Sequence, residues 1–515
     1  MKMKEDLLGL IQSLSMSEKR YFKLFVAKNS IGESSHYLKL FDLINKSGNV
    51  DKKVIQKLYG DNDFMEKQFL EYKYRLYKQI LKSLRSYYSE KSVDDKIMEL
   101  IRDAKILVNK SLYPDATKIL KKAKTIASKY EKHTLILEII RWQKKIVNVW
   151  SIHEKPDQKE AIDVFEEEKL TINKIDNANN YWKQHALMYL SYRINGVART
   201  QEVVELHKAI VDVPSLKNQE LALSFQAKKN FYATWQLYFV IINNLKESYE
   251  YSKKEVALME AHPHQIEDNA VLYNQAQHNL LFNLHTRKKY DELFMLLPKF
   301  KLMLRRFQLP LSVLIRSYNL EFEIYVETGQ YKKATLLLAK IEALIKEQKD
   351  KKELNELFFI VSKSYLYFGC GDYRKALTNI NLVLNEKRTQ VSLEHDIFIR
   401  VFHLIIHFEK GNIGLLPYLL KSLYRYLMQK KQLHKMERIF MKFIGSSLNK
   451  KKIKNYIEDF KLLREELLNI SNNPMEETFL NHIDVISWLE SKIDNRPFGE
   501  ILREKSGCAL EEEMD

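Results

Sequence analysis

The sequence predicts an all-α protein: an α-solenoid of antiparallel helical hairpins with a period of about 41 residues, preceded by a small helical N-terminal module. The first observation is a scarcity of turn residues. The chain has 13 Gly and 9 Pro among 515 residues. Together they make up about 4%, against roughly 12% in average usage. Strand-rich domains need turn signals every 8–12 residues or so. The other two observations are a recurring turn motif and apolar residues at helical spacing, and both are set out below.

Composition sets the class of protein before any motif is considered. Hydrophobic residues make up 45% and charged residues 29%, as in folded soluble proteins and unlike disordered ones. Two cysteines, Cys370 and Cys508, exclude a disulfide framework and a cysteine zinc site. The N-terminus lacks the apolar core of a signal peptide, and no run approaches 18 apolar residues. These features predict a cytoplasmic protein with no membrane contact.

The first part of the chain, residues 1–90, reads as a helical N-terminal module. Ser17 and Glu18 precede an apolar run, which predicts a capped helix start. A long helix is expected from about Phe64 to Tyr88, and a break near residues 90–94. The expected divisions are 1–90, the irregular hairpins of 91–224, the repeats of 225–470, and a C-terminal helix with an acidic tail over 471–515.

The helix expected at 64–88 carries two stripes. Its apolar seam, at alternating steps of four and three, consists of Leu70, Tyr74, Tyr77, Leu81, Leu84 and Tyr88. Its basic stripe consists of Arg75, Lys78, Lys82 and Arg85. A basic stripe beside tyrosines can lie along phosphates. The alternative, which the pattern favours, is a packed seam with a solvated basic back.

Within 91–224, hairpins are expected around residues 112–120 and 159–165. The clearest repeat motif lies further along, at 365–384. It reads as the end of a helix, a Gly-Asp turn, and a second helix that opens at Tyr373 and continues through Ala376. The unit before it repeats the pattern with Gly329, Tyr331 and Ala334.

The spacing of the aromatic residue of this motif locates weaker copies along the chain. We call the residue at this position the anchor. The anchors are Tyr249, Tyr290, Tyr331, Tyr373, Ile413 and Tyr456, at intervals of 41, 41, 42, 40 and 43. Seven residues after each anchor stand Val256, Leu297, Leu338, Ile380, Leu420 and Leu463. Ten residues after stand Met259, Phe300, Ile341, Val383, Leu423 and Glu466. Offsets of seven and ten share one helix face, so each second helix is expected to bury a stripe.

The motif resembles the turn of tetratricopeptide repeats, most clearly over residues 318–387 and more weakly over about 225–470. In that family a glycine closes the first helix, and a small residue three after the aromatic lets the two helices approach. Two features depart from the family: the period is about 41 rather than 34, and Leu293, Leu416 and Asp459 replace the small residue. The resemblance implies a groove lined by the first helices that binds a segment of a partner protein.

Candidate sites for chemistry are few. His403 and His407 share a helix face, with His395 and Glu409 nearby, but the glutamate of the zinc-protease motif is missing and the surroundings are apolar. Core or groove histidines are therefore favoured over a metal site. Asp61 and Asp63 match the first ligand positions of a calcium-binding loop. The glycine and the final glutamate that such a loop requires are missing from the positions that follow. No phosphate-binding loop, nucleophile elbow or dinucleotide fingerprint exists. We expect no catalytic residues, no cofactor and no metal.

The function favoured by the sequence is a non-enzymatic scaffold that binds a peptide or helix of a partner in the solenoid groove. The net charge of +17 favours an acidic partner. The alternative is a nucleic-acid-linked regulator, in which the basic N-terminal module contacts DNA or RNA and the repeats sense a partner.

Overall fold

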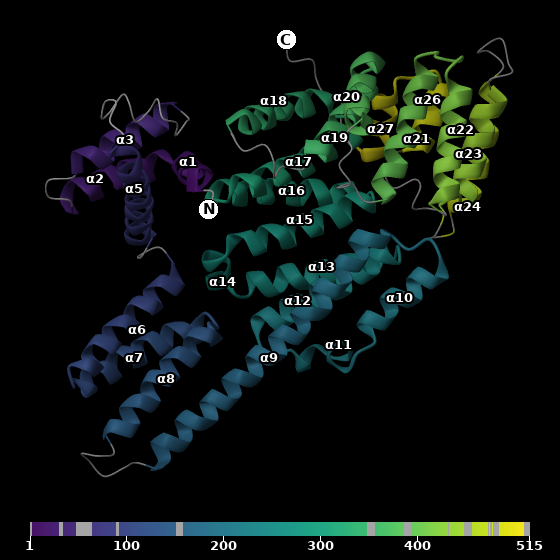
Figure 1. The fold of residues 1–515 in the computed structure, drawn as a ribbon. Helices are drawn as coiled ribbons and strands as arrows, with labels where there is room; N and C mark the ends of the chain where they lie inside the picture. The colour runs from purple at the N-terminus through teal and green to yellow at the C-terminus, as the bar shows by residue number, and fades with distance from the viewer. Residues whose placement is uncertain are drawn as a thin grey trace. The chain divides into compact units, whose positions relative to one another are not determined.

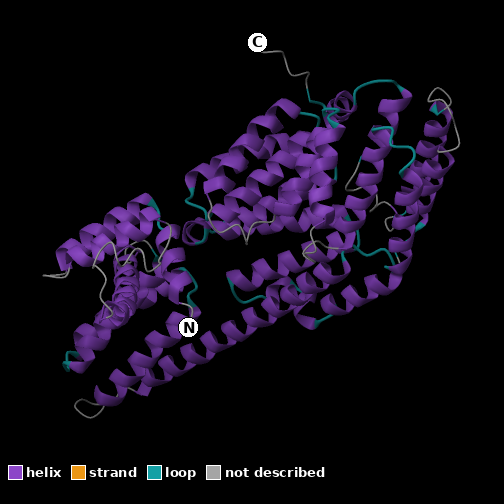
Figure 2. Ribbon diagram, turned by 45° about the horizontal axis from the view of Figure 1, so that its top comes forward, coloured by secondary structure: helices purple, strands orange, loops and turns teal. Residues whose placement is uncertain are grey.

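A computed structural model describes residues 3–29, 34–47, 64–88, 92–150, 158–347, 356–385, 393–430, 432–447, 456–471, 473, 476 and 484–508. Every regular element in these ranges is a helix (Figure 2), which confirms the all-α class. The chain divides into two compact units, Met1–Ile175 and Asp176–Asp515. The boundary lies within the long helix α9, Gln158–Asn195, so that helix contributes to both units.

The first unit begins with four helices around one apolar core (Figure 1). They are α1 (Met3–Ser13), α2 (Met16–Asn29), α3 (Ser34–Ser47) and α5 (Phe64–Tyr88). The start of α2 is a capping box, because the Ser15 amide donates to Glu18 Oε2 at 2.6 Å and the Glu18 amide donates to Ser15 Oγ at 3.3 Å. Helix α5 has the bounds expected from the sequence.

Three further helices of this unit, with the start of α9, enclose a second apolar core. They are α6 (Val93–Asn109), α7 (Tyr113–Lys129) and α8 (His133–Trp150). The turns between them use Ser111 and Glu131 in the left-handed backbone region, at φ 62° and 51°. Ala104 and Ala116 are fully buried, and their small side chains let α6 and α7 pack closely. The hairpin expected around residues 112–120 is thus α6–α7.

The second unit consists of helical hairpins packed one after another. Before them come α10 (Gln201–Val211), α11 (Pro214–Lys217) and the 3₁₀ helix η1 (Gln219–Leu221), and the short α14 (Pro263–Asp268) follows the first hairpin. The hairpins are α12 (Phe225–Ile241) with α13 (Leu245–Glu260), α15 (Ala270–Thr286) with α16 (Tyr290–Arg306), α17 (Leu311–Glu327) with α18 (Tyr331–Glu347), α19 (Glu356–Gly369) with α20 (Tyr373–Asn385), α21 (Leu393–Glu409) with α22 (Leu416–Gln429), and α23 (Lys435–Ser447) with α24 (Ile457–Ser471).

Each of the first five hairpin turns contains one residue in the left-handed backbone region. These residues are Asn243, Lys288, Gly329, Gly371 and Gly411, with φ between 55° and 76°. The residue after each one bonds back to the first helix; the Gln330 amide, for example, donates to the Tyr325 carbonyl at 2.8 Å. This is the Schellman arrangement that ends a helix. Because Asn and Lys replace Gly in the first two turns, the motif fades there in sequence.

The turn geometry shows that the first of the six anchor residues, Tyr249, does not occupy the expected position. In the later turns the anchor stands two residues after the left-handed residue, as Tyr331 follows Gly329. The corresponding residue after Asn243 is Leu245, where α13 begins. Tyr249 therefore lies in the second turn of α13, and the prediction that it opens the helix was wrong. Tyr249 is nevertheless buried, so its aromatic character was a core signal rather than a turn signal.

The expected buried stripe of the second helices is present. Three residues after the anchor, the small Ala334 and Ala376 and the large Leu293 are all at 0% exposure, whereas Asp459 is half-buried. The positions seven and ten after are buried at Leu297, Phe300, Leu338, Ile341, Ile380, Val383, Leu423 and Leu463. Leu420 is half-buried, and the exception named from sequence, Glu466, is exposed. Each buried aliphatic side chain contributes about 1.5–3 kcal/mol of hydrophobic stabilisation.

Beyond the last hairpin, two helices fold back onto the hairpin turns. These are α26 (Val485–Ile493) and α27 (Phe498–Ser506), where a single C-terminal helix was expected; the acidic tail after residue 508 lies outside the described residues. The ring of Tyr331 lies between Gly369 and Gly499, since a Cβ at either glycine would overlap it. A Cβ at Gly329 would likewise overlap the carbonyl oxygen of Gly499. Glycine thus permits the close approach of α27.

The two turn glycines provide a test of this docking. Gly371→Ala is expected to lower the free energy of unfolding by about 1–2 kcal/mol, because alanine is strained in the left-handed region. Gly329→Ala has the same backbone strain, with φ of 72° against 76°, and its methyl group also displaces α27, which adds a further ~1–3 kcal/mol. Denaturant unfolding measures both. Equal losses for the two variants would contradict the close packing of Gly329 against Gly499.

Candidate functional site

The first helices of five successive hairpins line a cavity of about 270 Å³ in the second unit. Its walls come from the last turns of α12, α15 and α17, the middle of α19 and the first turns of α21. The lining residues therefore shift along the first helices from one hairpin to the next. The polar residues that line it include Asn243, His285, Lys288, Glu323, Glu327, Ser362, His395 and Asp484. The second helices reach only its rim, through Leu245 and Tyr290.

His285 and Glu327 form a pair in the wall of this cavity. His285 Nε2 lies 3.2 Å from Glu327 Oε2, and its side chain is 9% exposed. Burial lowers the pKa of His285 to about 4, because a charged imidazolium loses its hydration. At neutral pH the ring is therefore uncharged. The negative charge of Glu327 is thus not neutralised by its histidine neighbour.

Glu323 lies one helical turn before Glu327, so the two carboxyl groups face the same cavity. It accepts hydrogen bonds from Ser362 Oγ at 2.9 Å and from Asn319 Nδ2 at 2.8 Å. Burial and then the neighbouring charge of Glu327 raise the pKa of Glu323 to about 7. Near neutral pH the protonated and ionised forms of Glu323 are therefore similarly populated. A cation in the cavity would favour the ionised form.

Asp484 closes one side of the cavity from the C-terminal segment. Its Oδ1 accepts from the Ser487 amide at 2.9 Å, which caps α26, and Lys288 Nζ lies 3.2 Å from its Oδ2. Although burial opposes ionisation, Lys288 and Lys505 hold the pKa of Asp484 below its usual value. The charged carboxylate thus connects α26 to the turn between α15 and α16.

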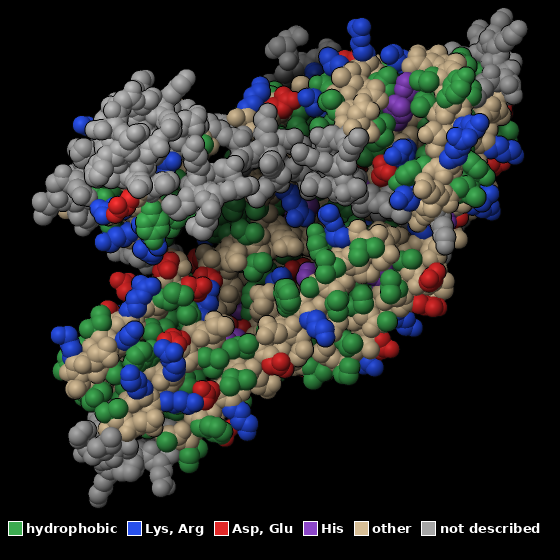
Figure 3. All heavy atoms as spheres, in the orientation of Figure 1, with side chains coloured by type: hydrophobic (Ala, Val, Ile, Leu, Met, Phe, Trp, Pro, Cys, Tyr) green, Lys and Arg blue, Asp and Glu red, His purple; other side chains and the backbone are tan. Residues whose placement is uncertain are grey.

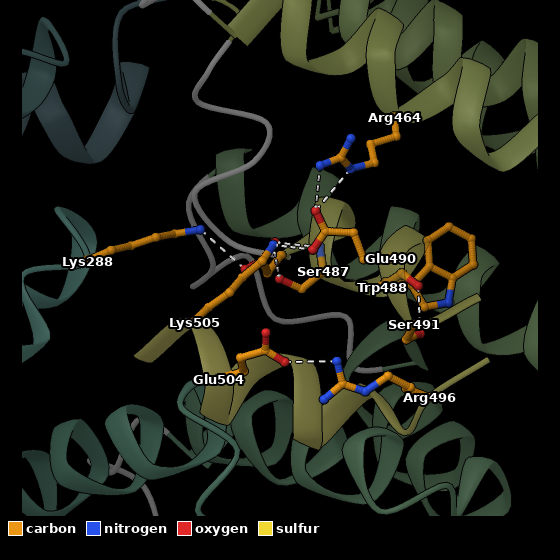
Figure 4. A network of polar contacts seen from close by, with 10 residues as sticks. Lys288, Arg464, Ser487, Trp488, Glu490, Ser491, Arg496, Glu504 and Lys505 are labelled. Atoms are coloured by element: carbon orange, nitrogen blue, oxygen red, sulfur yellow. Dashed lines mark hydrogen bonds and ion pairs between the residues drawn. The ribbon is translucent and has the colours of Figure 1, made fainter. Parts of the chain in front are cut away.

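Further ion pairs hold α26 and α27 in this position (Figure 4). Glu490 of α26 contacts Arg464 of α24 at 2.9 Å and Lys505 of α27 at 2.5 Å. Trp488, at 1% exposure, donates from Nε1 to Glu409 at 2.6 Å, and Glu409 also pairs with Lys492 at 2.6 Å. Such buried or half-buried pairs fix one geometry more than they stabilise it.

Sequence reasoning missed His285, Glu323, Glu327 and Asp484 as members of one site. One signal for them was present, because Glu327 and Glu409 both stand four residues before an anchor, Tyr331 and Ile413. A repeated acid at the end of first helices could have indicated a common face. Asp484 could not have been found this way, since it lies outside the repeats and reaches the cavity only because α26 folds back.

The basic stripe of α5 lies on an exposed face, as expected for each of Arg75, Lys78, Lys82 and Arg85. Arg75 pairs with Glu71 at 2.6 Å. Hydrogen bonds to Tyr37 and then to Glu71 raise the pKa of Arg75 above its usual value. Lys78 Nζ lies 5.4 Å from the ring centroid of Tyr74. The stripe is thus accessible, and part of its charge is already paired.

The apolar seam expected on α5 is displaced. The buried positions are Lys73, Leu76, Ile80 and Ser83, at 0–3% exposure. Tyr77, Leu81 and Leu84 are half-buried, whereas Tyr74 and Tyr88 are 47% and 42% exposed; the side chain of Leu70 lies outside the described part. The heptad pattern failed because α5 packs against three short helices whose core selects Leu76 and Ile80, and not against a long coiled-coil partner.

The structure separates the residues of the histidine cluster weighed from sequence. His403 and His407 contact each other, with Nε2 atoms 3.1 Å apart, and Asn412 Nδ2 contacts His407 Nδ1 at 2.8 Å. His395 lines the central cavity, and Glu409 contacts α26. Among the residues that the structure describes, no three His, Cys, Asp or Glu side chains are placed to bind a metal ion. The segment around Asp61 and Asp63 lies outside those residues.

Neither cysteine forms a disulfide. Cys370 is exposed at a hairpin turn, and Cys508 Sγ accepts from Gln330 Nε2 at 3.3 Å. Over the described ranges, none of the helices combines the length and the apolar character needed to cross a bilayer. In comparisons with known proteins, no family model, no curated protein sequence and no solved structure matches the chain significantly.

The raised pKa of Glu323 predicts a pH-dependent effect of its replacement. Between about pH 4.5 and 7 the folded state binds more protons than the unfolded state, so this group lowers stability as pH rises. Glu323→Gln removes the charge, and we expect little change in the free energy of unfolding at pH 5 and a gain on the order of 1 kcal/mol at pH 8. Denaturant unfolding at the two pH values measures this.

The matched control is Glu267→Gln, which removes an exposed carboxylate on α14. Its effect should be small and the same at both pH values. A gain for Glu323→Gln that is equal at pH 5 and pH 8 would show that burial does not perturb this carboxyl group.

Proposed function

We propose that the chain is a non-enzymatic scaffold whose second unit binds an extended peptide segment of a partner protein in the central cavity. The observation that carries the proposal is the lining of the cavity by consecutive first helices. This is where the resemblance to tetratricopeptide repeats locates a peptide groove, and the left-handed turns at Gly329 and Gly371 support that resemblance.

The size of the cavity favours an extended segment over a helix. A helix with its side chains is about 10–12 Å wide, and a cavity of about 270 Å³ has room for a few side chains only. Its walls combine apolar residues such as Phe282, Val326 and Phe398 with the polar cluster. An apolar wall with a few fixed polar groups is typical of ligand sites.

The charges of the lining favour a peptide with a basic side chain. Glu323, Glu327 and Asp484 face the cavity, and Lys288 is the one lysine or arginine that lines it. The acidic partner expected from net charge does not suit this lining. Lysine and arginine side chains are scattered over the visible surface rather than gathered at one site (Figure 3), so the net charge says little about the cavity.

Selection from a phage-displayed random heptapeptide library against the full chain tests the proposal. We expect the enriched peptides to contain Lys or Arg, and to bind Glu327→Gln at least about tenfold more weakly, because a desolvated charge-assisted contact is worth roughly 1.5–3 kcal/mol. Fluorescence anisotropy with the synthetic peptides gives the dissociation constants.

Glu267→Gln serves again as the control, because it removes the same charge at an exposed position away from the cavity lining. Peptides that bind this control as tightly as the wild type, and Glu327→Gln more weakly, support the central cavity as the site. Enriched peptides without basic residues, or equal affinity for all three proteins, would refute it.

A second candidate function, contact with nucleic acid, is favoured by one observation on the first unit. Lys78, Lys82 and Arg85 occupy the exposed face of α5, and the partly exposed Tyr74 and Tyr88 lie on the same helix. Cations can displace the counterions of a phosphate backbone, and exposed aromatic rings can stack on bases.

The salt dependence of binding tests this candidate. With a fluorescent 20-base-pair DNA, the triple variant Lys78→Gln, Lys82→Gln, Arg85→Gln is expected to reduce the slope of log affinity against log salt by roughly 2–3, because each phosphate contact contributes about 0.9. The control neutralises Lys105, Lys121 and Lys122, exposed lysines of α6 and α7. Equal slopes for the wild type and the triple variant would exclude α5 as the contact.

A further inference from the structure

A second hollow, of about 450 Å³, lies between α21 and α22, away from the central cavity. It is lined by Arg400, Tyr418, Lys421, Ser422, Arg425, Tyr426 and Gln429. Six of these seven residues come from α22, at helical spacings of three and four, so they share one face of that helix. The opposite face of α22 buries Leu416, Leu423 and Leu427, which keeps the polar face turned outward.

Arg400 is held in place at this hollow by two neighbours. Its Nε donates to Asp396 Oδ2 at 3.3 Å, and its guanidinium carbon lies 4.1 Å from the ring centroid of Tyr426. The Tyr426 hydroxyl donates to the same Asp396 oxygen. The guanidinium plane is therefore oriented by stacking on Tyr426 and by its hydrogen bond to Asp396.

Positive charge around the hollow exceeds negative charge. Lys421 and Arg425 lie one turn apart on α22, and neither has an ion pair within the described ranges. Helix α22 contains no Asp or Glu. On another second helix, α13, the exposed Lys253 is paired with Glu250 at 2.9 Å. Around the hollow there are thus three cations, Arg400, Lys421 and Arg425, and one carboxylate, Asp396. This carboxylate already accepts hydrogen bonds from Arg400 and Tyr426.

We infer that this hollow binds a phosphoryl group, the dianionic end of a phosphate monoester. The donors that converge on it are a guanidinium, two further cations and the hydroxyl of Ser422. A phosphate monoester carries a charge of about −1.5 to −2 at pH 7 and three strong acceptor oxygens, which matches this set. A lone carboxylate has one charge and two oxygens, and would leave part of the set without a partner. Tyr418, 72% exposed at the rim, offers an apolar surface to the carrier of the phosphate.

The inference is independent of the proposed peptide binding in the central cavity, because no residue lines both sites. The test uses the full chain and a fluorescein-labelled octapeptide with one phosphoserine, followed by fluorescence anisotropy. We expect the phosphopeptide to bind and its dephosphorylated form to bind at least tenfold more weakly. Displacement by O-phosphoserine alone assigns an organic monoester as the ligand, and equal displacement by inorganic phosphate assigns the bare phosphoryl group.

Two variants locate the binding. Lys421→Gln/Arg425→Gln should weaken phosphopeptide binding at least tenfold, whereas Lys332→Gln/Arg374→Gln, which neutralises exposed cations of α18 and α20, should not change it. Arg400→Lys keeps the charge and removes the guanidinium fork, and we expect it to weaken binding about three- to tenfold. Thermal unfolding confirms that each variant is folded.

The inference is overturned if the dephosphorylated peptide binds equally well, or if the Lys421/Arg425 variant binds like the wild type. It is also overturned if a triglutamate peptide displaces the phosphopeptide as effectively as O-phosphoserine does, because the hollow would then attract any anion. An unchanged affinity of Arg400→Lys would show that charge alone, and not the oriented guanidinium, attracts the ligand, and would likewise refute the phosphoryl assignment.

Discussion

The second unit depends on the hairpin turn, in which one residue adopts a left-handed backbone shortly before the second helix begins. The turn is short, so the two helices of each hairpin must be antiparallel neighbours. Its backbone bond back to the first helix fixes where that helix ends. Because these ends recur in register, the last turns of α12, α15 and α17 lie side by side, and Asn243, His285 and Glu327 face one cavity. The same tightness at Gly329 makes room for the backbone of Gly499.

The ends of this array are tied to its other parts, which gives the cavity fixed walls. Arg199, between α9 and α10, forms a two-pronged ion pair with Glu437 of α23, whose side chain is 1% exposed. At the other end Asp484 reaches Lys288 from the segment before α26. Helical repeat arrays are otherwise held by contacts between neighbouring hairpins only. Contacts between distant parts restrict how far the hairpins can slide, and a cavity built from five of them needs that restriction to keep one shape.

The features of the structure that could be predicted from sequence are those that depend on local interactions. The all-α class, the bounds of α5 and the buried stripe at Ala334 and Ala376 depend on spacing within one helix or one hairpin, and they were predicted. The first turn was misplaced because a left-handed Asn243 has no clear signature, whereas glycine does. The seam of α5 was displaced because its partners, not its own period, select the buried face. The cavity could not be predicted, because its residues meet only after hairpins 40 residues apart pack together and α26 folds back.

Net charge was the weakest guide, and the reason is physical. A total of +17 sums exposed groups whose interactions are largely screened by salt once they are more than about 10 Å apart, so it does not determine the potential at any one site. Local pairing does. In the cavity, buried His285 is neutral, so the acids Glu323 and Glu327 set the sign. At α22 the sequence supplies Lys421 and Arg425 with no acid on the same helix, and the sign is reversed. One chain thus presents an acidic cavity and a basic hollow, and the charge at each is set by its own residues and not by the charge of the whole.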